Sequence, residues 1–181
     1  MIECRETKIL GRNFFKVRRL YLTAFPKIER HPVMELFSAS SKGKAEFLHF
    51  TENGQFIGLA YMIVRGDVAF LLYLAVDDSK RNVGYGSAIL DAIKDRYEGL
   101  DVVLLIESLH EPCENIDIRR RRKAFYLRNG FLDTGFLQTS CGGEANYDIL
   151  NTKDPFSTES YRNLLLNYPF KSYLEEIRKI L

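Results

Sequence analysis

The 181-residue sequence lacks the features that mark membrane and disulfide-rich proteins. It has no run approaching the ~18 consecutive apolar residues of a membrane span, and its N-terminus shows no signal-peptide pattern. Its three cysteines, Cys4, Cys113 and Cys141, are widely scattered and form no C-x-x-C pair, so no disulfide framework is indicated. We therefore expect a cytoplasmic protein that has no membrane partner.

A strong excess of one charge and a metal-binding pattern are also missing. The 26 Lys and Arg residues face 24 Asp and Glu residues, and this balance argues against a dedicated nucleic-acid binder. His31, His49 and His110 show no metal-ligand spacing, because His110-Glu111 lacks the second His of H-E-x-x-H. With 46% hydrophobic and 28% charged residues, the composition is that of one ordinary globular domain, and the missing ligand spacing leads us to expect no metal.

The centre of the sequence predicts a strand, a helix and a second strand. Residues 70–76 are an uninterrupted apolar run, and residues 102–106 form another that carries Glu107 at its end. Between them, residues 87–97 place apolar side chains at helical spacing, and Gly99 closes the helix. Two strands joined in this way lie parallel through a right-handed crossover.

The segments before this crossover predict antiparallel strands and short helices. Strands are expected over 45–51 and 55–64, because Asn53-Gly54 between them is a strong hairpin signal. Gly58 inside the second strand indicates a bulge or a close backbone approach. Further upstream we expect a weak edge strand in 1–10, a helix at 13–25, a proline-bounded loop at 25–32, a helical turn at 33–37 and a polar loop at 38–44.

The segments after the crossover complete a mixed sheet. We expect an irregular stretch at 108–118, a basic helix at 119–129, strands at 131–140 and 145–150, and a turn at 141–143. Residues 152–181 predict a helical appendage with helices at 161–167 and 173–181. The predicted fold is therefore α+β: one domain over residues 1–181, with a mostly antiparallel central sheet, one parallel crossover and flanking helices.

The turn before the central helix carries the first chemical signal. Gly84 and Gly86 lie in its first turn, where backbone N–H groups have no intrahelical partner and the helix dipole is positive. Such a site suits a pyrophosphate, and Arg81 adds a cation; a plain strand-to-helix turn remains the alternative. A dinucleotide motif would need glycine at Ile89, and a P-loop would need Gly-Lys followed by Ser or Thr.

The pattern R-x-x-G-x-G at residues 81–86, after a strand that ends Leu-Ala-Val, resembles the GNAT superfamily of acyl-CoA-dependent N-acetyltransferases. A second stretch, 122–131, resembles the second GNAT signature, a helix that bears Phe125-Tyr126 and ends in Gly130-Phe131. Many members of the family carry an Asn about two turns before the Tyr, where this chain has Arg119. The resemblance covers residues 25–150.

The resemblance implies acetyl-CoA as co-substrate and a site around it. Tyr126 would be the general acid toward the sulfur, and Glu107 or Glu29 would be the base that deprotonates the amine. The residues implied to contact coenzyme A are the strand end Leu74, Ala75 and Val76, and the turn Arg81, Asn82, Val83, Gly84, Tyr85, Gly86 and Ser87.

The implied reaction is direct attack of a primary amine on the thioester in a ternary complex. The acceptor could be a small amine, an antibiotic, an amino acid or a protein terminus, and the chain could be a monomer or a homodimer. Two other functions stay open: an idle GNAT-like module that binds coenzyme A as a sensor, and a dinucleotide-dependent oxidoreductase, which Ile89 disfavours.

Overall fold

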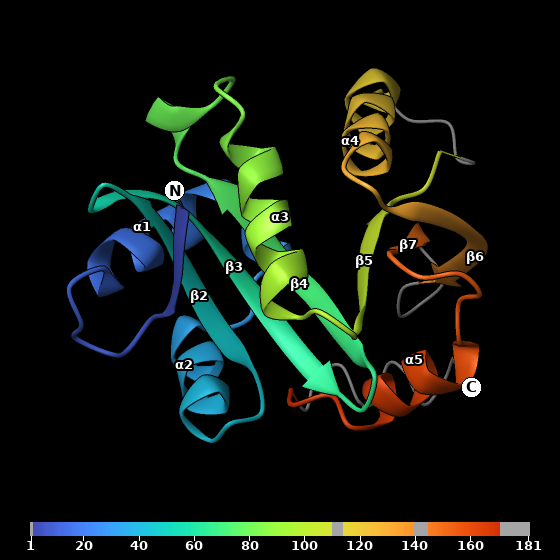
Figure 1. The fold of residues 1–181 in the computed structure, drawn as a ribbon, viewed down its shortest axis with the longest axis horizontal. Coiled ribbons are helices and arrows are strands. Elements are labelled where there is room, and N and C mark those ends of the chain that lie inside the picture. The colour runs from blue at the N-terminus through green and yellow to red at the C-terminus, as the bar shows by residue number, and fades with distance from the viewer. Residues whose placement is uncertain (1, 110–113, 140–144, 171–181) are drawn as a thin grey trace. The chain divides into compact units, whose positions relative to one another are not determined.

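The computed structural model describes residues 2–109, 114–139 and 145–170 (Figure 1). These residues contain seven strands in the sheet order β1-β2-β3-β4-β5-β7-β6, and the only parallel pair among them is β4 with β5. The chain divides into two compact units, Met1–Ile63 with Leu71–Glu98, and Val64–Phe70 with Gly99–Leu181. The expected mixed, mostly antiparallel sheet is confirmed, while the single domain over residues 1–181 stays a prediction.

The first unit holds the N-terminal half of the sheet and three helices. Its elements are β1 (Ile2–Glu6), α1 (Phe14–Ala24), α2 (Val33–Ser41), β2 (Glu46–Glu52), most of β3 (Gln55–Arg65), the end of β4 (Val68–Val76) and α3 (Tyr85–Arg96). Tyr61 of β3 faces α2, where its hydroxyl donates to the Leu36 carbonyl at 2.9 Å. Gly58 faces α3 through Ile89, so α2 and α3 cover opposite faces of β3.

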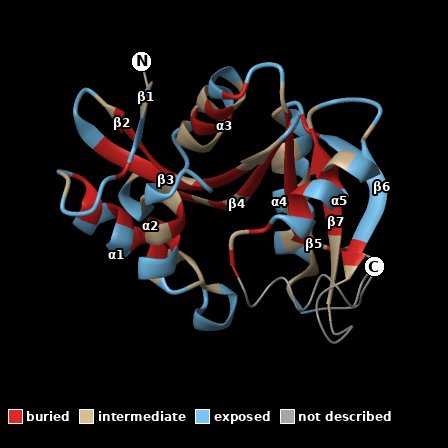
Figure 2. Cartoon of the chain, turned by 90° about the horizontal axis from the view of Figure 1, so that it is seen from below, coloured by how far each residue is buried: buried red, intermediate tan, exposed pale blue. Residues whose placement is uncertain are grey.

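The hairpin between β2 and β3 forms as expected. Asn53 and Gly54 have φ values of 49° and 73°, the positive pair that a type I′ turn requires. The register shifts after Phe50, which pairs with Gly58, so β3 carries the predicted bulge. The strand is buried along most of its length (Figure 2).

The second unit holds the rest of the sheet and two helices. Its elements are the tip of the β3–β4 hairpin, β5 (Asp101–Glu107), α4 (Ile116–Arg128), β6 (Leu132–Thr139), β7 (Asn146–Asn151) and α5 (Thr158–Leu166). The parallel pairing joins only Val68–Phe70 of β4 to Asp101–Val103 of β5, and from Leu104 onward β5 pairs antiparallel with β7. Tyr161 of α5 anchors that helix by donating to Gln138 of β6 at 2.6 Å.

Two helix boundaries differ from the sequence prediction. The turn expected at 33–37 is a helix that continues to Ser41, because Ala39 is buried and continues the apolar face that Leu36 and Phe37 begin. The basic helix expected at 119–129 begins three residues earlier, at Ile116, so the stretch 108–118 is not irregular throughout. This helix buries none of its residues fully, and therefore its sequence had no apolar periodicity to mark its start.

The C-terminal prediction is tested only in part. The helix expected at 161–167 is confirmed by α5. The turn at 141–143 and the helix at 173–181 lie outside the described residues. No described helix has the length and apolarity that crossing a membrane requires.

Candidate functional site

The turn that follows β4 is built by short-range polar contacts. Asp77 ends the strand, since its N–H donates to the Ile57 carbonyl of β3 at 2.9 Å. Its Oδ1 accepts from the N–H and the hydroxyl of Ser79 at 3.1 and 2.6 Å, and this bonding holds the pKa of Asp77 below its usual range. The exposed Arg81, which the sequence analysis expected to add a cation here, pairs with Asp78 at 2.6 Å.

The start of α3 presents backbone donors that the protein does not use. Gly84 is the N-cap residue at φ 88°, a left-handed conformation that favours glycine, and its carbonyl accepts from Ala88. In the described part of the chain no acceptor is found for the N–H groups of Tyr85, Gly86 and Ser87. The first turn also carries no acidic side chain. This helix end therefore suits an anion, by its donors and by its dipole.

The side chain of Tyr85 has a structural role. Its hydroxyl donates to Glu52 Oε2 at the end of β2 at 2.7 Å, and this bond raises the pKa of Tyr85. The contact ties the start of α3 to β2. Only the main chain of Tyr85 is thus left to hold a ligand.

Gly58 brings β3 against the end of β4, as its position in the sequence predicted. A Cβ atom at residue 58 would lie 2.6 Å from the Ala75 carbonyl oxygen and 2.8 Å from Ile89 Cδ1. Glycine therefore sets the distance between β3, the segment Leu74 to Val76 and α3. The main chain of that segment is part of the site that the resemblance implies for coenzyme A.

The loop that carries Glu29 is fixed to the first unit by buried tyrosines. The Tyr73 hydroxyl donates to the Glu29 carbonyl at 2.7 Å and accepts from the His31 N–H at 3.2 Å. The Tyr21 hydroxyl donates to the His31 carbonyl at 3.0 Å. Burial raises the pKa of Tyr21 and of Tyr73, so both hydroxyls keep their protons at neutral pH. Three hydrogen bonds thus hold the backbone beside the exposed Glu29 side chain.

Glu107 and Tyr126 belong to the second unit. Glu107 ends β5, and its two carboxylate oxygens pair with Arg119 at 3.2 Å and Arg122 at 2.8 Å. Tyr126 lies on α4, half-buried, with its ring against Phe125 and Phe131 at centroid distances of 5.2 and 5.6 Å. Burial raises the pKa of Tyr126 to about 12, although Arg122 acts in the opposite direction. The phenol is therefore protonated at neutral pH.

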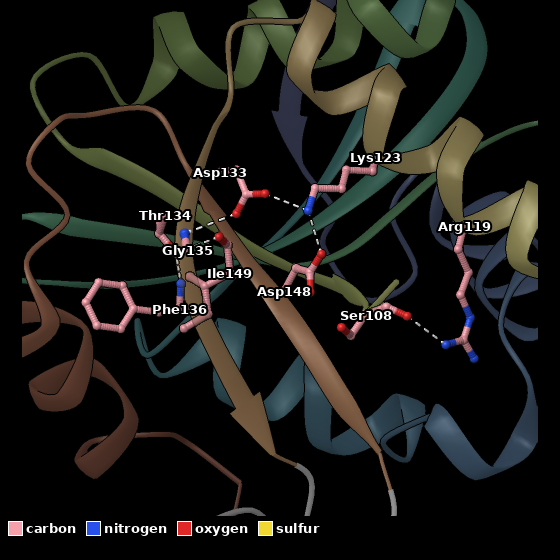
Figure 3. A network of polar contacts seen from close by, with 9 residues as sticks. All are labelled: Ser108, Arg119, Lys123, Asp133, Thr134, Gly135, Phe136, Asp148 and Ile149. Atoms are coloured by element: carbon pink, nitrogen blue, oxygen red, sulfur yellow. Dashed lines mark hydrogen bonds and ion pairs between the residues drawn. The ribbon is translucent and has the colours of Figure 1, made fainter. Parts of the chain in front are cut away.

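Lys123 of α4 forms ion pairs with two strands of the second unit. Figure 3 shows its ammonium between two carboxylates, Asp133 of β6 at 2.6 Å and Asp148 of β7 at 2.7 Å. The Asp148 side chain is only 3% exposed, so this pair is largely withdrawn from water. One turn earlier, Arg119 donates to the Ser108 carbonyl at 3.0 Å. These contacts fix the helix that carries Tyr126.

The predicted residues fall into two groups. Glu29 and the residues from Leu74 to Ser87 lie in the first unit, whereas Glu107 and Tyr126 lie in the second. Within the described ranges, no group of three or more His, Cys, Asp or Glu side chains could hold a metal ion.

The sequence matches the model of a family described as the acetyltransferase (GNAT) domain, over residues 43–132. That match includes the strand β4, the donor-rich start of α3 and Tyr126. The chain belongs to the GNAT acetyltransferases. It is accordingly an enzyme of the acyltransferase class.

Solved structures with the same fold support the family at the level of architecture. A protein of Bacteroides thetaiotaomicron assigned to the GNAT family is 17% identical, with a TM-score of 0.77, and the match covers 95% of this chain and 98% of that one. The ribosomal-protein-S18-alanine N-acetyltransferase of Escherichia coli is 18% identical, with a TM-score of 0.60 over 88% and 97%. An aminoglycoside 6'-N-acetyltransferase complexed with coenzyme A is 12% identical, with a TM-score of 0.64 over 82% and 95%. A comparison with curated protein sequences finds no match.

Sequence reasoning missed the partners that support this GNAT site. Arg122 and Lys123 follow Arg119 by three and four residues, which places both on its side of a helix and is visible in the sequence. Their acceptors Glu107 and Asp148 lie on separate strands, and only the folded sheet reveals them.

Proposed function

We propose that this GNAT enzyme transfers an acetyl group from acetyl-CoA to a primary amine by direct attack in a ternary complex. The observation that carries the proposal is the start of α3, where three consecutive N–H groups lack acceptors in the described part of the chain and no acidic side chain competes. A diphosphate would take these donors. Binding of coenzyme A by a GNAT enzyme of the same fold supports this choice of anion.

The residues of the first unit would hold the co-substrate. Gly84, Gly86 and Ser87 would bind the diphosphate through their main chain, as would Tyr85, with Asn82 and Val83 completing the turn. Arg81 would exchange its exposed partner Asp78 for a phosphate oxygen, because an exposed ion pair contributes little. The main chain of Leu74, Ala75 and Val76 would bind the pantetheine arm. This part of the strand lies beyond the parallel pairing with β5, which ends at Phe70.

Tyr126 would act on the sulfur as the thioester breaks. Attack by a neutral amine builds negative charge on the carbonyl oxygen, which a backbone N–H can stabilise, and then releases a thiolate. The Tyr126 phenol, with a pKa of about 12, is a weaker acid than a thiol, whose pKa is about 8.5. Its proton would therefore stabilise the developing thiolate through a hydrogen bond, while the proton that the thiolate finally takes would come from the amine nitrogen by way of the base.

The base would be Glu29 or Glu107, acting directly or through water. Both oxygens of Glu107 are engaged by arginines, so this carboxylate would have to exchange one partner to accept a proton. Replacing each acid by Gln separates them. The base variant should lose activity most at low pH, where the amine is charged, and should recover part of it as the pH rises.

Calorimetry with acetyl-CoA tests the diphosphate site. Gly84→Val should lose binding, because valine at φ 88° would distort the donor-bearing backbone. Gly43→Val is the matched control, since Gly43 also has a positive φ of 66° and open space around it but lies in the loop after α2. Equal affinities in the two variants would refute the site.

An acceptor screen with detection of free thiol tests the reaction. The panel should include aminoglycosides and peptides with an N-terminal alanine, because similar folds are named for both acceptors. Release of coenzyme A that depends on one amine supports transfer. Tight binding of acetyl-CoA without turnover on any amine would contradict acetyl transfer and favour a protein that binds coenzyme A as a sensor.

A further inference from the structure

The first unit contains a cavity of about 450 Å³ beside the edge strand β1. Its lining residues come from β1, from the segment between β1 and α1, and from β2 with its following turn. None of them belongs to the stretch from Leu74 to Ser87 that the proposed acetyl-CoA site uses. The volume is in the range of small-molecule sites, ~300–1,000 Å³.

Buried polar side chains line this cavity. Asn13 is 8% exposed and His49 is 9% exposed, yet both face the cavity. Asn13 precedes α1 without capping it, and its amide has no hydrogen-bond partner in the described part of the chain. Its amide atoms still reach the solvent of the cavity, so they can form hydrogen bonds with a ligand or with water there.

His49 adds a ring nitrogen to the same surface. It pairs across the sheet with Arg5, and its Nδ1 shares a hydrogen bond of 3.0 Å with the Thr7 hydroxyl, which leaves Nε2 for a ligand. Burial, with Arg5 adding to it, lowers the pKa of His49, so the ring is neutral at neutral pH. A neutral imidazole and an amide offer hydrogen bonds without placing a buried charge in the site.

The charges around the cavity favour an anion. Its two acids are engaged, Glu3 by Arg5 at 2.9 Å and Glu6 by Arg96 at 3.7 Å. Lys8 and Arg12 also line the cavity, and neither has an ion-pair partner in the described part of the chain. The first turn of α1, which follows Asn13 directly, contains no acidic side chain, so the positive end of its dipole is not neutralised.

We propose that this cavity is a second ligand site, for a small anion with a carboxylate or phosphate group. Asn13 and His49 donate or accept hydrogen bonds at its buried surface, and Lys8 and Arg12 supply the positive charge at its opening. The cavity shares no residue with the proposed acetyl-CoA site.

Nuclear magnetic resonance with two simple anions tests the proposal. Inorganic phosphate and malonate are each titrated into the full chain with saturating coenzyme A, so that the start of α3 is already occupied. At least one anion should shift the Asn13 amide and His49 ring signals, with a dissociation constant on the order of 1 mM. Arg12→Glu should weaken this binding at least about tenfold, because it reverses the charge of a lining residue.

Lys42→Glu is the control for net charge. Lys42 is exposed at the C-terminal end of α2 and does not line the cavity, so this variant should bind as the wild type does. A response to malonate alone would assign the site to carboxylates, and a response to phosphate alone would assign it to phosphates. Absence of a saturable shift with either anion, or equal weakening in both variants, would overturn the proposal.

A second variant, Asn13→Ala, tests the site in case Arg12→Glu does not fold. Asn13→Ala removes the unpaired amide but no hydrogen bond within the protein, so the melting temperature without added anion should change little. The rise in melting temperature that phosphate or malonate gives the wild type should be lost. An undiminished rise in this variant would contradict the role of Asn13.

Discussion

Replacing Gly58 by alanine would place a methyl group at the contact between β3, β4 and α3. The new Cβ would lie 2.6 Å from the Ala75 carbonyl oxygen, 2.8 Å from Ile89 Cδ1 and 3.4 Å from Val76 Cα. Relaxed contacts between non-bonded atoms are about 3.5 Å, so the Ala75 backbone would have to move by roughly 0.9 Å. The Ile89 side chain can rotate away, but the carbonyl belongs to a strand and cannot.

Overpacking of this kind costs about 1–3 kcal/mol. Removing a glycine from the unfolded chain returns about 0.4–1 kcal/mol, which leaves an expected loss of about 1–2 kcal/mol. For a chain of this size that loss lowers the melting temperature by about 2–8 °C. Because Ala75 and Val76 are proposed to bind the pantetheine arm, the KM for acetyl-CoA should rise as well.

Denaturant unfolding and steady-state kinetics of Gly58→Ala measure both effects. Gly43→Ala is the control, since a Cβ there has no atom within 4 Å and only its φ of +66° is unfavourable. The control should lose stability through the backbone alone, by about 1–2 kcal/mol, and should keep the wild-type KM. A Gly58→Ala protein with wild-type stability and KM would refute the reasoning from the close approach.

Three further predictions concern the second unit and His49. Tyr126→Phe should lower kcat by roughly 10²-fold or more with little change in the KM for acetyl-CoA, measured by thiol release, because only the hydroxyl is lost; an unchanged kcat would exclude it from the chemistry. Lys123→Ala should destabilise the protein by about 3–5 kcal/mol in denaturant unfolding, since Asp148 would keep a buried charge, and Lys123→Ala with Asp148→Asn should recover much of that loss. Because the pKa of His49 is lowered in the folded state, the folded protein binds a proton at His49 less well than the unfolded chain does. The free energy of unfolding should therefore fall as the pH drops from about 6.5, the pKa of an unperturbed histidine, toward the lowered pKa of His49. His49→Gln should therefore lose less stability than the wild type between pH 7 and pH 5, and equal losses would contradict this assignment.

The elements with strong periodicity or distinctive turns were predictable from the sequence. The hairpin at Asn53-Gly54 follows from a turn geometry that few residue types can adopt, and the bulge at Gly58 follows from a glycine inside a strand. The crossover from β4 through α3 to β5 follows from two apolar runs around an amphipathic helix.

What the sequence could not predict depends on contacts between distant segments. The start of α4 has no apolar stripe, so no periodicity marked it. The pairing of Lys123 with Asp133 and Asp148 requires the register of β6 and β7 before the three residues can meet. The cavity at β1 also needs that kind of information, since Arg5 and His49 become neighbours only when β1 pairs with β2.

The Tyr73 hydroxyl joins two parts of the enzyme that different substrates would use. Tyr73 directly precedes Leu74 on β4, and its hydroxyl takes both a donor and an acceptor from the loop that carries Glu29. A shift of β4 on loading of the acyl carrier would be passed to that loop through these two bonds. We therefore expect the affinity for the amine to depend on whether the acyl carrier is bound. In Tyr73→Phe, which lacks both hydrogen bonds, the affinity for the amine should no longer depend on the carrier.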